Sequence, residues 1–403
     1  MREKRVMYII TGMTMFLCLG TIYSWSVFQK PLIDEFYRVN GEVVSQTLAN
    51  MPYTIFLLAY AFSMPFAGKM ITKFKPKTVS LIGTAFVGIA WIVSSTVNSM
   101  EMLVFTYGVI GGMGVGIIYG VPIAVVAKWY PNKKGFAVGL TLLGFGLSPF
   151  ITAPIANKLI MTFGALSTFR IIGIFFLVIL AFLSLFLKYP ELKNNEDLSK
   201  NEINFNLKEM TKTKQFYGLW ACYTIGTVAG LMIIGISSVY AQEVLGFSAT
   251  KSAFLISFFA IFNGIGRPVF GTITDKMGSK KAALISYFSI LLVSILILIF
   301  PSNVTVFIVT FAVIWANLGG WLAIAPTSTA NLFGNKYYSE NYGLIFTAYG
   351  VGALIQGFIS GIIKEKFGSY TYVFYPLIVL VIIGMFIVLK TLKKVEFHDM
   401  IEE

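Results

Sequence analysis

Charged residues are scarce in this chain of 403 residues. Asp, Glu, Lys and Arg make up 12% of it, against roughly 25% in an ordinary soluble domain. With 57% apolar residues, a soluble protein would have too few polar side chains to cover its surface. The scarcity of charge excludes a soluble enzyme and a disordered protein, and it indicates a polytopic membrane protein.

Cysteine and histidine are almost absent. Cys18 and Cys222 lie inside apolar runs, where cysteine behaves as a small buried hydrophobe, and the one histidine is His398. Two cysteines exclude a disulfide scaffold, and these residues offer no set of metal ligands. No cluster of His, Cys or acidic residues lies within the apolar runs. We therefore predict a protein that is not an enzyme and has no metal and no cofactor.

Apolar residues gather in twelve long runs. Each run is long enough to cross the hydrocarbon core of a bilayer as a helix, and a helix satisfies its own backbone polar groups where there is no water. We predict an all-α membrane protein with twelve transmembrane helices, at about residues 6–28, 44–67, 78–97, 102–127, 135–157, 165–187, 215–240, 250–273, 280–300, 303–329, 340–363 and 370–391.

Basic residues outnumber acidic ones, 31 to 18, and the formal net charge is +13. With the N-terminus placed in the cytoplasm, about 23 Lys and Arg fall on the cytoplasmic side and about six on the other, while Arg170 and Arg267 lie within runs. This positive-inside pattern predicts a multi-pass protein of the plasma or inner membrane with both termini in the cytoplasm. It also explains the excess charge without a nucleic-acid partner.

The most polar stretch, residues 188–214, divides the runs six and six. Three pairs of landmarks recur at offsets of 203 to 206 residues: Gly68 with Gly271, Pro122 with Pro326, and Gly144 with Gly350. The repeat predicts an N-terminal six-helix bundle at 1–187, a cytoplasmic linker at 188–214, a C-terminal six-helix bundle at 215–391 and a cytoplasmic tail at 392–403. Two such halves place a substrate site between them, near the midplane of the membrane.

The connection between the eighth and ninth runs carries a recognisable motif. Residues 271–281 read GTITDKMGSKK, which resembles the signature of the major facilitator superfamily. The resemblance implies that superfamily's fold of two six-helix bundles. It also implies a gate at the cytoplasmic turn formed by Gly271, Asp275, Lys276, Gly278, Lys280 and Lys281.

The residue types suit such a turn. Gly271 allows a close helix approach, and Asp275 can accept from a helix N-terminus or a basic partner. The lysines suit lipid headgroups. The first half carries a second copy of this motif, in which Thr72 and Lys73 stand in place of the pair Asp275 and Lys276. This difference predicts a weaker gate on the first-half side.

Three further segments show a narrower resemblance. Residues 20–28 read GTIYSWSVF, residues 112–120 read GMGVGIIYG and lead into KWYPNKKG at 128–135, and residues 263–268 read NGIGRP. Together they resemble the oxalate:formate antiporter family, which is related to the monocarboxylate transporters. The resemblance implies transport of small organic carboxylates, and it gives Arg267 the role of the substrate-binding arginine.

Arg267 also stands out on physical grounds. It lies within the eighth run, where a charge is costly unless it faces a cavity or a partner, and no acidic residue lies in the core of any run. A guanidinium binds a carboxylate through two parallel hydrogen bonds. The alternative is that Arg267 packs against backbone carbonyls. Asn263, one turn earlier, stands where proton-coupled monocarboxylate transporters have an aspartate, so carboxylate-mediated proton coupling is not expected.

The other candidate substrate-binding residues are aromatic or polar. Tyrosine offers one hydroxyl donor while its ring forms the wall of a cavity, and tryptophan can line the same cavity. Both residue types can equally serve in packing alone. Lys30 is either an outer attractor of anions or a solvated rim lysine. The remaining candidates are Tyr23, Tyr119, Trp25, Trp321, Tyr349 and Gln356.

Tyr349 marks a departure from the family. Oxalate transporters that this chain resembles carry a second embedded cation, a lysine, where this chain has Tyr349. One cation suits a monoanion, because a dianion would keep an uncompensated charge in a low-dielectric site.

We therefore predict a secondary transporter of a small organic monocarboxylate such as lactate, pyruvate or formate, working by alternating access as a monomer in the bilayer. A proton or a counter-anion as coupled partner stays open. The alternatives are an oxalate-type dicarboxylate antiporter, a facilitator for an unrelated small molecule, and a carboxylate sensor that does not transport.

Overall fold

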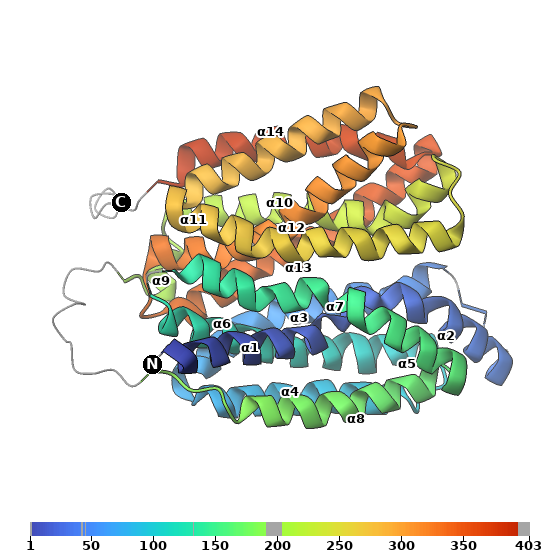
Figure 1. The fold of residues 1–403 in the computed structure, drawn as a ribbon, viewed down its shortest axis with the longest axis horizontal. Helices are drawn as coiled ribbons and strands as arrows, with labels where there is room; N and C mark the ends of the chain where they lie inside the picture. Colours follow the sequence, from blue (N-terminus) through green and yellow to red (C-terminus); the bar gives the residue numbers. More distant parts are fainter. Residues whose placement is uncertain (1, 42, 45, 132, 191–203, 394–403) are drawn as a thin grey trace.

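The structure is a computed structural model that describes residues 2–41, 43–44, 46–131, 133–190 and 204–393. Within these ranges the chain forms helices and no strands, which confirms the predicted all-α class. The helices run along one long axis in two layers, with α1–α8 in one layer and α10–α14 in the other (Figure 1). Residues 191–203 of the predicted linker, and residues 394–403 of the predicted tail with His398, lie outside the described ranges.

The first half contains the helices up to residue 184. Their bounds are α1 Arg2–Leu19, η1 Gly20–Ser24, α2 Trp25–Asn40, α3 Gln46–Lys73, α4 Pro76–Ser94, α5 Met100–Leu103, η2 Val104–Gly111, α6 Gly112–Trp129, α7 Lys134–Phe163 and α8 Ala165–Ser184. The second half follows a short helix, α9 Leu207–Met210. Its bounds are α10 Lys214–Glu243, α11 Ala249–Ile299, α12 Val304–Phe333, α13 Tyr338–Phe367, η3 Tyr370–Val373 and α14 Phe374–Thr391.

Eleven helices of the described chain are long and apolar enough to cross a membrane. One of them, α11, comprises two spans, because Gly278 interrupts it with φ 81° and ψ 164°, a backbone conformation that glycine adopts without strain. Each of the twelve predicted runs is therefore found as a helix, and the twelve-helix fold is confirmed.

Polar caps start several of the helices in the second half. The side-chain oxygens of Thr213, Ser248 and Asn303 accept hydrogen bonds from backbone N–H groups in the first turns of α10, α11 and α12. These contacts satisfy donors that have no partner inside a helix. The sequence therefore fixes where these spans begin.

The chain stays helical beyond its first membrane span, Arg5–Ser24, and beyond the predicted run. After the 3₁₀ turn η1, the chain continues as α2 to Asn40. Phe28, Leu32 and Phe36 are buried at intervals of four residues, while the lysine and aspartate of the same helix are exposed. A helix with one apolar and one polar face is not a continuous apolar run, so a prediction based on apolar length alone ends too early.

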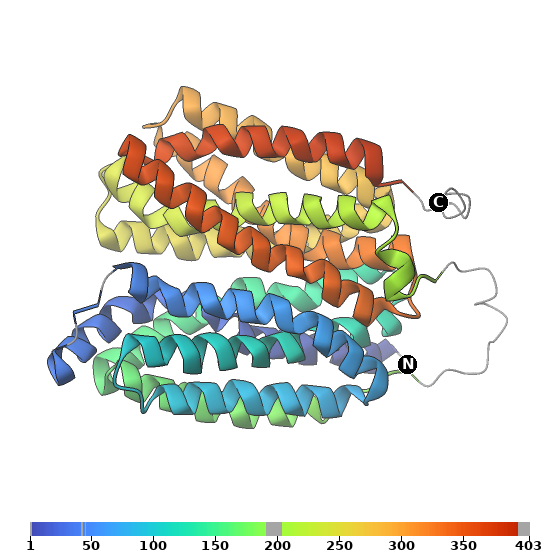
Figure 2. The same ribbon diagram turned by 180° about the vertical axis from the view of Figure 1, so that it is seen from behind.

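Two pairs of long helices join the halves. Helix α7 packs along α11 (Figure 1), and α3 packs along α13, which the reverse view shows (Figure 2). Glycines allow the backbones to touch: a Cβ atom at Gly139 would overlap the carbonyl of Arg267, and one at Gly68 would overlap that of Ser339. Close helix contact of this kind is typical of membrane proteins, where small residues line helix interfaces.

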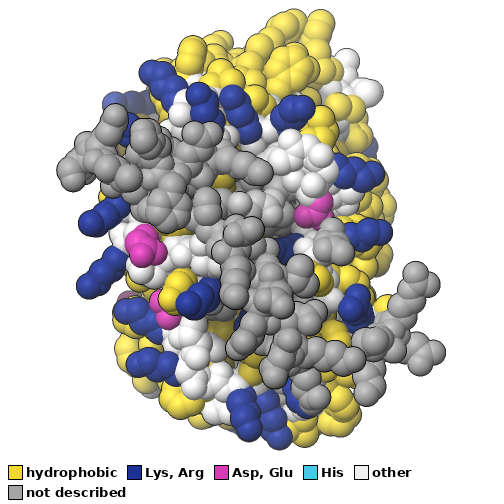
Figure 3. All heavy atoms as spheres, turned by 90° about the vertical axis from the view of Figure 1, so that its left-hand side faces the viewer, with side chains coloured by type: hydrophobic (Ala, Val, Ile, Leu, Met, Phe, Trp, Pro, Cys, Tyr) yellow, Lys and Arg dark blue, Asp and Glu magenta, His cyan; other side chains and the backbone are white. Residues whose placement is uncertain are grey.

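Both described termini lie at the same end of the molecule (Figure 1). This end, which we call the basic end, also contains the α3–α4, α6–α7 and α12–α13 connections and the turn at Gly278. Lysine and arginine side chains surround this face, with few acidic ones among them (Figure 3). We call the other end, which contains the α2–α3, α7–α8 and α10–α11 connections, the opposite end.

Candidate functional site

Arg267 lies at the centre of the interface between the halves and is fully buried. Its Nη1 donates to the Leu142 carbonyl of α7 over 2.8 Å, and its Nη2 donates to Asn263 Oδ1 over 3.2 Å. Its Nε has no partner among the described residues. The guanidinium carbon lies 5.5 Å from the centre of the Phe145 ring. The positive charge is therefore surrounded by neutral groups.

Asn263 orients this arginine. Its amide Nδ2 donates to the Trp315 carbonyl over 3.1 Å, which leaves Oδ1 to accept from Arg267. No described acidic side chain forms an ion pair with Arg267. A buried cation without an acidic partner is energetically costly, and an incoming anion would offset that cost.

The first half contributes two of the predicted tyrosines. Tyr23 and Tyr119 both pack on Phe145, whose ring lies beside the guanidinium of Arg267. Their rings lie edge-on to Phe145, with centroid distances of 5.3 Å and 5.5 Å. Tyr119 belongs to α6, which is buried over most of its length. The Tyr119 hydroxyl has no hydrogen-bond partner in the described chain.

The second half contributes Tyr349 and Trp321, both fully buried. The Tyr349 hydroxyl lies 2.6 Å from the Tyr23 hydroxyl and forms a hydrogen bond across the two halves. Trp321 stacks on Tyr223, with ring centroids 6.3 Å apart, and Tyr223 in turn lies 6.4 Å from Tyr349. The structure thus brings six predicted residues into one aromatic site, comprising Arg267, Asn263, Tyr23, Tyr119, Tyr349 and Trp321.

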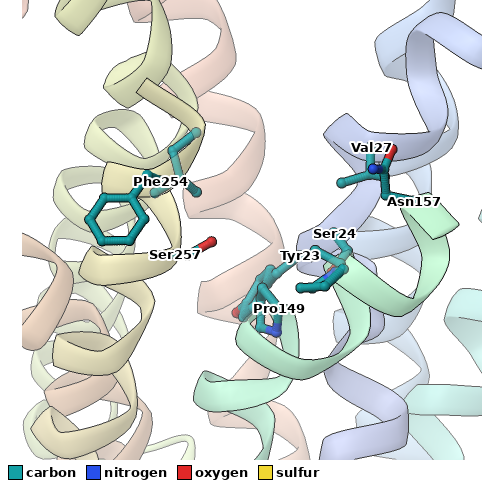
Figure 4. Close-up of a pocket in the computed structure, with 10 residues that line it drawn as sticks. Tyr23, Ser24, Val27, Pro149, Asn157, Phe254 and Ser257 are labelled. Atoms are coloured by element: carbon teal, nitrogen blue, oxygen red, sulfur yellow. The ribbon is translucent and has the colours of Figure 1, made fainter. Parts of the chain in front are cut away.

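A pocket of about 270 Å³ reaches this site from the opposite end. One wall comes from η1 and α2 with Tyr23 and Ser24, another from α7 with Pro149 and Asn157, and the third from the start of α11 with Phe254, Ile256 and Ser257. Figure 4 shows Tyr23 between the α7 and α11 sides of this space. Tyr23 therefore belongs both to the pocket and to the aromatic site around Arg267.

The basic end is closed by contacts between the halves. Asp275 accepts hydrogen bonds from the backbone N–H groups of Gly135 and Phe136, at 2.9 Å and 3.0 Å, and both groups belong to the first turn of α7. A carboxylate is stabilised at a helix N-terminus by these unpaired donors and by the helix dipole. Gly271 and Gly135 approach so closely that neither position has space for a side chain. Lys276 and Lys281 are exposed nearby, and Lys280 is half-buried.

The first-half counterpart of this contact is different. Thr72 donates to Glu340 Oε1 at 3.1 Å, and the same hydroxyl also lies 2.8 Å from the Lys69 carbonyl. Glu340 stands in the first turn of α13, so here the carboxylate belongs to the helix whose N-terminus lies at the contact. One hydroxyl proton shared between two acceptors replaces the two backbone donors found at Asp275.

Three predicted site residues lie away from Arg267. Trp25 packs in the first half, where its ring stacks on Tyr107 at 5.4 Å and its indole N–H donates to the Ala49 carbonyl. Lys30 is exposed and pairs with Asp34 on α2. Gln356 is half-buried, with its side-chain oxygen near Gly235 of α10.

Four aromatic residues of the site were not predicted, namely Tyr60, Phe145, Tyr223 and Phe346. Phe346 lies between both halves, with its ring centroid 4.9 Å from that of Tyr60. On α13 the spacing of Tyr342, Phe346 and Tyr349 places all three rings on one helix face, and this signal is visible in the sequence. Tyr60 and Tyr223 carry no such signal. A π-helix, Val104–Gly111, precedes α6 and was not predicted either.

The described residues contain no group of three or more His, Cys, Asp or Glu side chains that could hold a metal ion. The polar atoms around Arg267 come instead from phenols, an amide and a backbone carbonyl. Apart from the carbonyl and the amide oxygen, these groups offer hydrogens. Such a set is suited to binding an anion.

Comparison with known proteins agrees with this arrangement. The family model of the Major Facilitator Superfamily matches residues 6–355. The oxalate:formate antiporter of Oxalobacter formigenes is 26% identical over 368 residues, covering 90% of this chain and 85% of that protein. Monocarboxylate transporter 12 of Mus musculus is 27% identical over 328 residues, covering 73% of this chain and 67% of that protein. An uncharacterised MFS-type transporter of Escherichia coli is 25% identical over 354 residues, with 88% of this chain and 86% of that protein covered.

Proposed function

The chain belongs to the Major Facilitator Superfamily, and from this premise we propose that it carries a small organic monocarboxylate across the membrane, with Arg267 binding the carboxylate. The substrate is of the lactate, pyruvate or formate type. Transport proceeds by alternating access, in which the two six-helix bundles rock around a central site. The bundles comprise residues 1–187 and 215–391, joined by the linker 188–214 and followed by the tail 392–403.

One observation carries the proposal: Arg267 is fully buried between the halves, and none of the acidic residues that the structure describes pairs with it. A guanidinium that donates only to a carbonyl and an amide retains a net positive charge in a low-dielectric site. A carboxylate would neutralise that charge and accept hydrogen bonds from it, and charge-assisted bonds of this type are about twice as strong as neutral ones. The relatives named for oxalate, formate and monocarboxylates support this substrate class.

The choice of a monoanion rests on the rest of the site. Tyr349 is fully buried and hydrogen-bonds to Tyr23, so its position contributes a neutral phenol. A dicarboxylate would keep one negative charge without a cation in this aromatic surrounding, at a considerable desolvation cost.

The two ends of the molecule support alternating access. The basic end is closed by two contacts between the halves: Asp275 accepts hydrogen bonds from the start of α7, and Thr72 donates one to Glu340. The pocket at Tyr23 opens from the opposite end. Rocking of the halves would break the first set of contacts and close the pocket. The lysines around the basic end support a cytoplasmic location of this end and of both termini, in a plasma or inner membrane (Figure 3). We propose that the protein works as a monomer, coupled to a proton, to a counter-anion or to neither.

A second candidate is an oxalate-type dicarboxylate antiporter, which the relative from Oxalobacter formigenes favours. Uptake into proteoliposomes separates the two candidates. Purified protein is reconstituted, and uptake of radiolabelled lactate, pyruvate, formate and oxalate is measured with and without the same anion inside. We expect flux of at least one monocarboxylate and little flux of oxalate. Oxalate exchange exceeding all monocarboxylates would favour the antiporter, and no carboxylate flux would refute both and favour a facilitator for another molecule.

A further inference from the structure

The segment that leads from the linker into α10 is tied to the second half at the basic end. Phe205 is buried, and its ring lies edge-on to that of Phe333, with centroids 6.1 Å apart. Its backbone N–H donates to the Phe333 carbonyl over 3.0 Å, and its carbonyl accepts from the side-chain amide of Asn341 over 2.9 Å. Asn341 is fully buried near the start of α13. Phe205 therefore connects the end of α12 to the start of α13.

The residues after Phe205 are fixed as well. The backbone N–H of Asn206 donates to the Glu209 carboxylate over 2.7 Å, and the N–H of Glu209 donates to Asn206 Oδ1 over 3.0 Å. These reciprocal bonds cap α9, and the side chain of Thr213 then caps α10. We call residues 204–213 the strap. Both ribbon views show α9 at the basic end, at the level where the two layers meet (Figures 1 and 2).

Asn204, at the beginning of the strap, holds the turn between α12 and α13. Its Oδ1 accepts hydrogen bonds from the backbone N–H groups of Asn335 and Lys336, both over 3.0 Å. These N–H groups lie between the two helices, outside the hydrogen-bond ladder of either. Because one oxygen holds two successive peptide groups, it fixes the orientation of the backbone from which the Asn335 side chain projects.

Asn335 in turn receives a contact from the first half. The ammonium of Lys134 donates to Asn335 Oδ1 over 2.9 Å. Lys134 is the first residue of α7 and directly precedes Gly135, whose backbone N–H donates to Asp275. A cation at a helix N-terminus is unfavourable for that helix, so α7 alone gives no reason for a lysine here. The lysine belongs to the segment KWYPNKKG at 128–135, whose role the central site does not explain.

We propose that Asn204 is a positioning residue for alternating access: it orients Asn335 toward Lys134, and the resulting contact helps to hold the basic end closed. This role rests on the alternating access of the proposed function and is independent of the substrate. Opening of the basic end separates α7 from the turn and breaks the bond between Lys134 and Asn335. The bonds of Asn204 and Phe205 lie within the second half and persist. The strap thereby couples the linker to the closure of the basic end.

The experiment measures hydrogen–deuterium exchange at the start of α7 in the purified, unliganded protein, corrected for the intrinsic rates of each sequence, together with thermal unfolding. Asn204→Ala removes the acceptor, Asn204→Asp keeps an acceptor oxygen, and Lys134→Met removes the ammonium. Asn303→Ala is the matched control. The Asn303 side chain also accepts from a backbone N–H, that of Val306 over 3.1 Å, but it caps α12 at the opposite end.

Asn204→Ala should accelerate exchange at the start of α7 by about fivefold, the factor that corresponds to one lost hydrogen bond. Lys134→Met should have the same effect. The double variant should exchange within about twofold of either single variant, because both substitutions remove the same contact. Asn204→Asp should keep the slow exchange of the unmodified protein. Asn303→Ala should lower thermal stability as Asn204→Ala does, and leave exchange at the start of α7 unchanged.

Three results would overturn the positioning role. If Asn204→Ala lowers thermal stability without changing exchange at the start of α7, Asn204 only stabilises the turn. If the effects of the Asn204 and Lys134 substitutions multiply in the double variant, the two residues act independently. Asn335→Ala leaves the backbone bonds to Asn204 in place, so unchanged exchange in this variant would refute the proposal even if Asn204→Ala does not fold.

Uptake of lactate tests the proposed function separately. Because exchange is measured without a substrate, the predicted exchange pattern together with no carboxylate flux would refute the proposed substrate and support the role of Asn204. Normal lactate flux with unchanged exchange in every variant would support the proposed function and refute that role.

Discussion

The hydroxyl oxygens of Tyr23 and Tyr349 lie 2.6 Å apart and connect the two halves of the molecule beside Arg267. Tyr23 belongs to the short turn η1 of the first half, and Tyr349 to α13 of the second. Tyr23 also lines the pocket that leads in from the opposite end. This hydrogen bond lies between the pocket and the buried arginine, so a ligand that enters through this pocket has to pass the pair before it reaches Arg267.

Tyr349→Lys should shift selectivity toward dicarboxylates. The new ammonium would lie near Arg267 and give the site two cations, which can compensate both charges of oxalate. We expect the ratio of oxalate to lactate uptake in proteoliposomes to rise by about tenfold or more. Tyr349→Phe is the control, since it removes the hydroxyl without adding a charge. An unchanged ratio in the lysine variant would contradict the charge-matching argument.

Arg267→Gln should reduce lactate uptake by about two orders of magnitude, because it removes the charge-assisted hydrogen bonds to the carboxylate. Arg267→Lys should also be strongly impaired, since an ammonium lacks the planar fork of the guanidinium. Arg170→Gln is the matched control: Arg170 is also within a span, but it is exposed and donates to Ser95 of the first half. Equal uptake by the Arg170 and Arg267 variants would refute the site assignment.

Asp275→Asn should weaken the closed basic end. The substitution removes the negative charge at the N-terminus of α7 and leaves at most one oxygen to accept from Gly135 and Phe136. A loss of about 1 kcal/mol is expected for such a contact, and hydrogen–deuterium exchange at the start of α7 should accelerate accordingly. Asp34→Asn, at an exposed pair with Lys30, is the control and should leave that exchange unchanged.

Thr72→Lys should have the opposite effect. Glu340 already faces this position, so a lysine there would form an ion pair between the halves in place of a shared hydroxyl proton. We expect slower lactate exchange together with slower hydrogen exchange at the start of α13, because the closed basic end is stabilised. Thr72→Lys combined with Glu340→Gln should restore the rate. Faster exchange in the single variant would contradict this account of the first-half contact.

Trp25→Phe should affect stability and leave substrate affinity unchanged. The indole N–H donates to the Ala49 carbonyl, and the ring stacks on Tyr107 within the first half. Losing the hydrogen bond costs about 1 kcal/mol, which thermal unfolding can detect. The KM for lactate should stay within about twofold of the unmodified value. A large rise in KM without a change in stability would place Trp25 in the substrate site after all.

Most of the fold follows from local properties of the sequence. A long apolar run in lipid has to become a helix to satisfy its backbone, so the twelve runs and their approximate bounds were predictable. A charged residue within a predicted membrane span is equally easy to recognise in the sequence. Arg267 lies within the eighth run, where exposing its charge to lipid would be energetically unfavourable. The exception is α2, whose apolar face is too narrow to register as an apolar run although it continues the first helix to Asn40.

The sequence by itself thus determined the twelve helices, their division into two halves and the position of Arg267 deep in the eighth run, with no acidic residue in the core of any run. Only the tertiary structure decided which aromatic residues surround Arg267. It brought Tyr60 and Tyr223 to the centre and turned Trp25 toward Tyr107 in the first half. The physical reason is that a membrane helix is apolar on the sides facing lipid and on those facing protein, so its sequence does not fix its rotation. Helix packing fixes that rotation, and glycine contacts such as those at Gly139 and Gly271 are what the packing depends on.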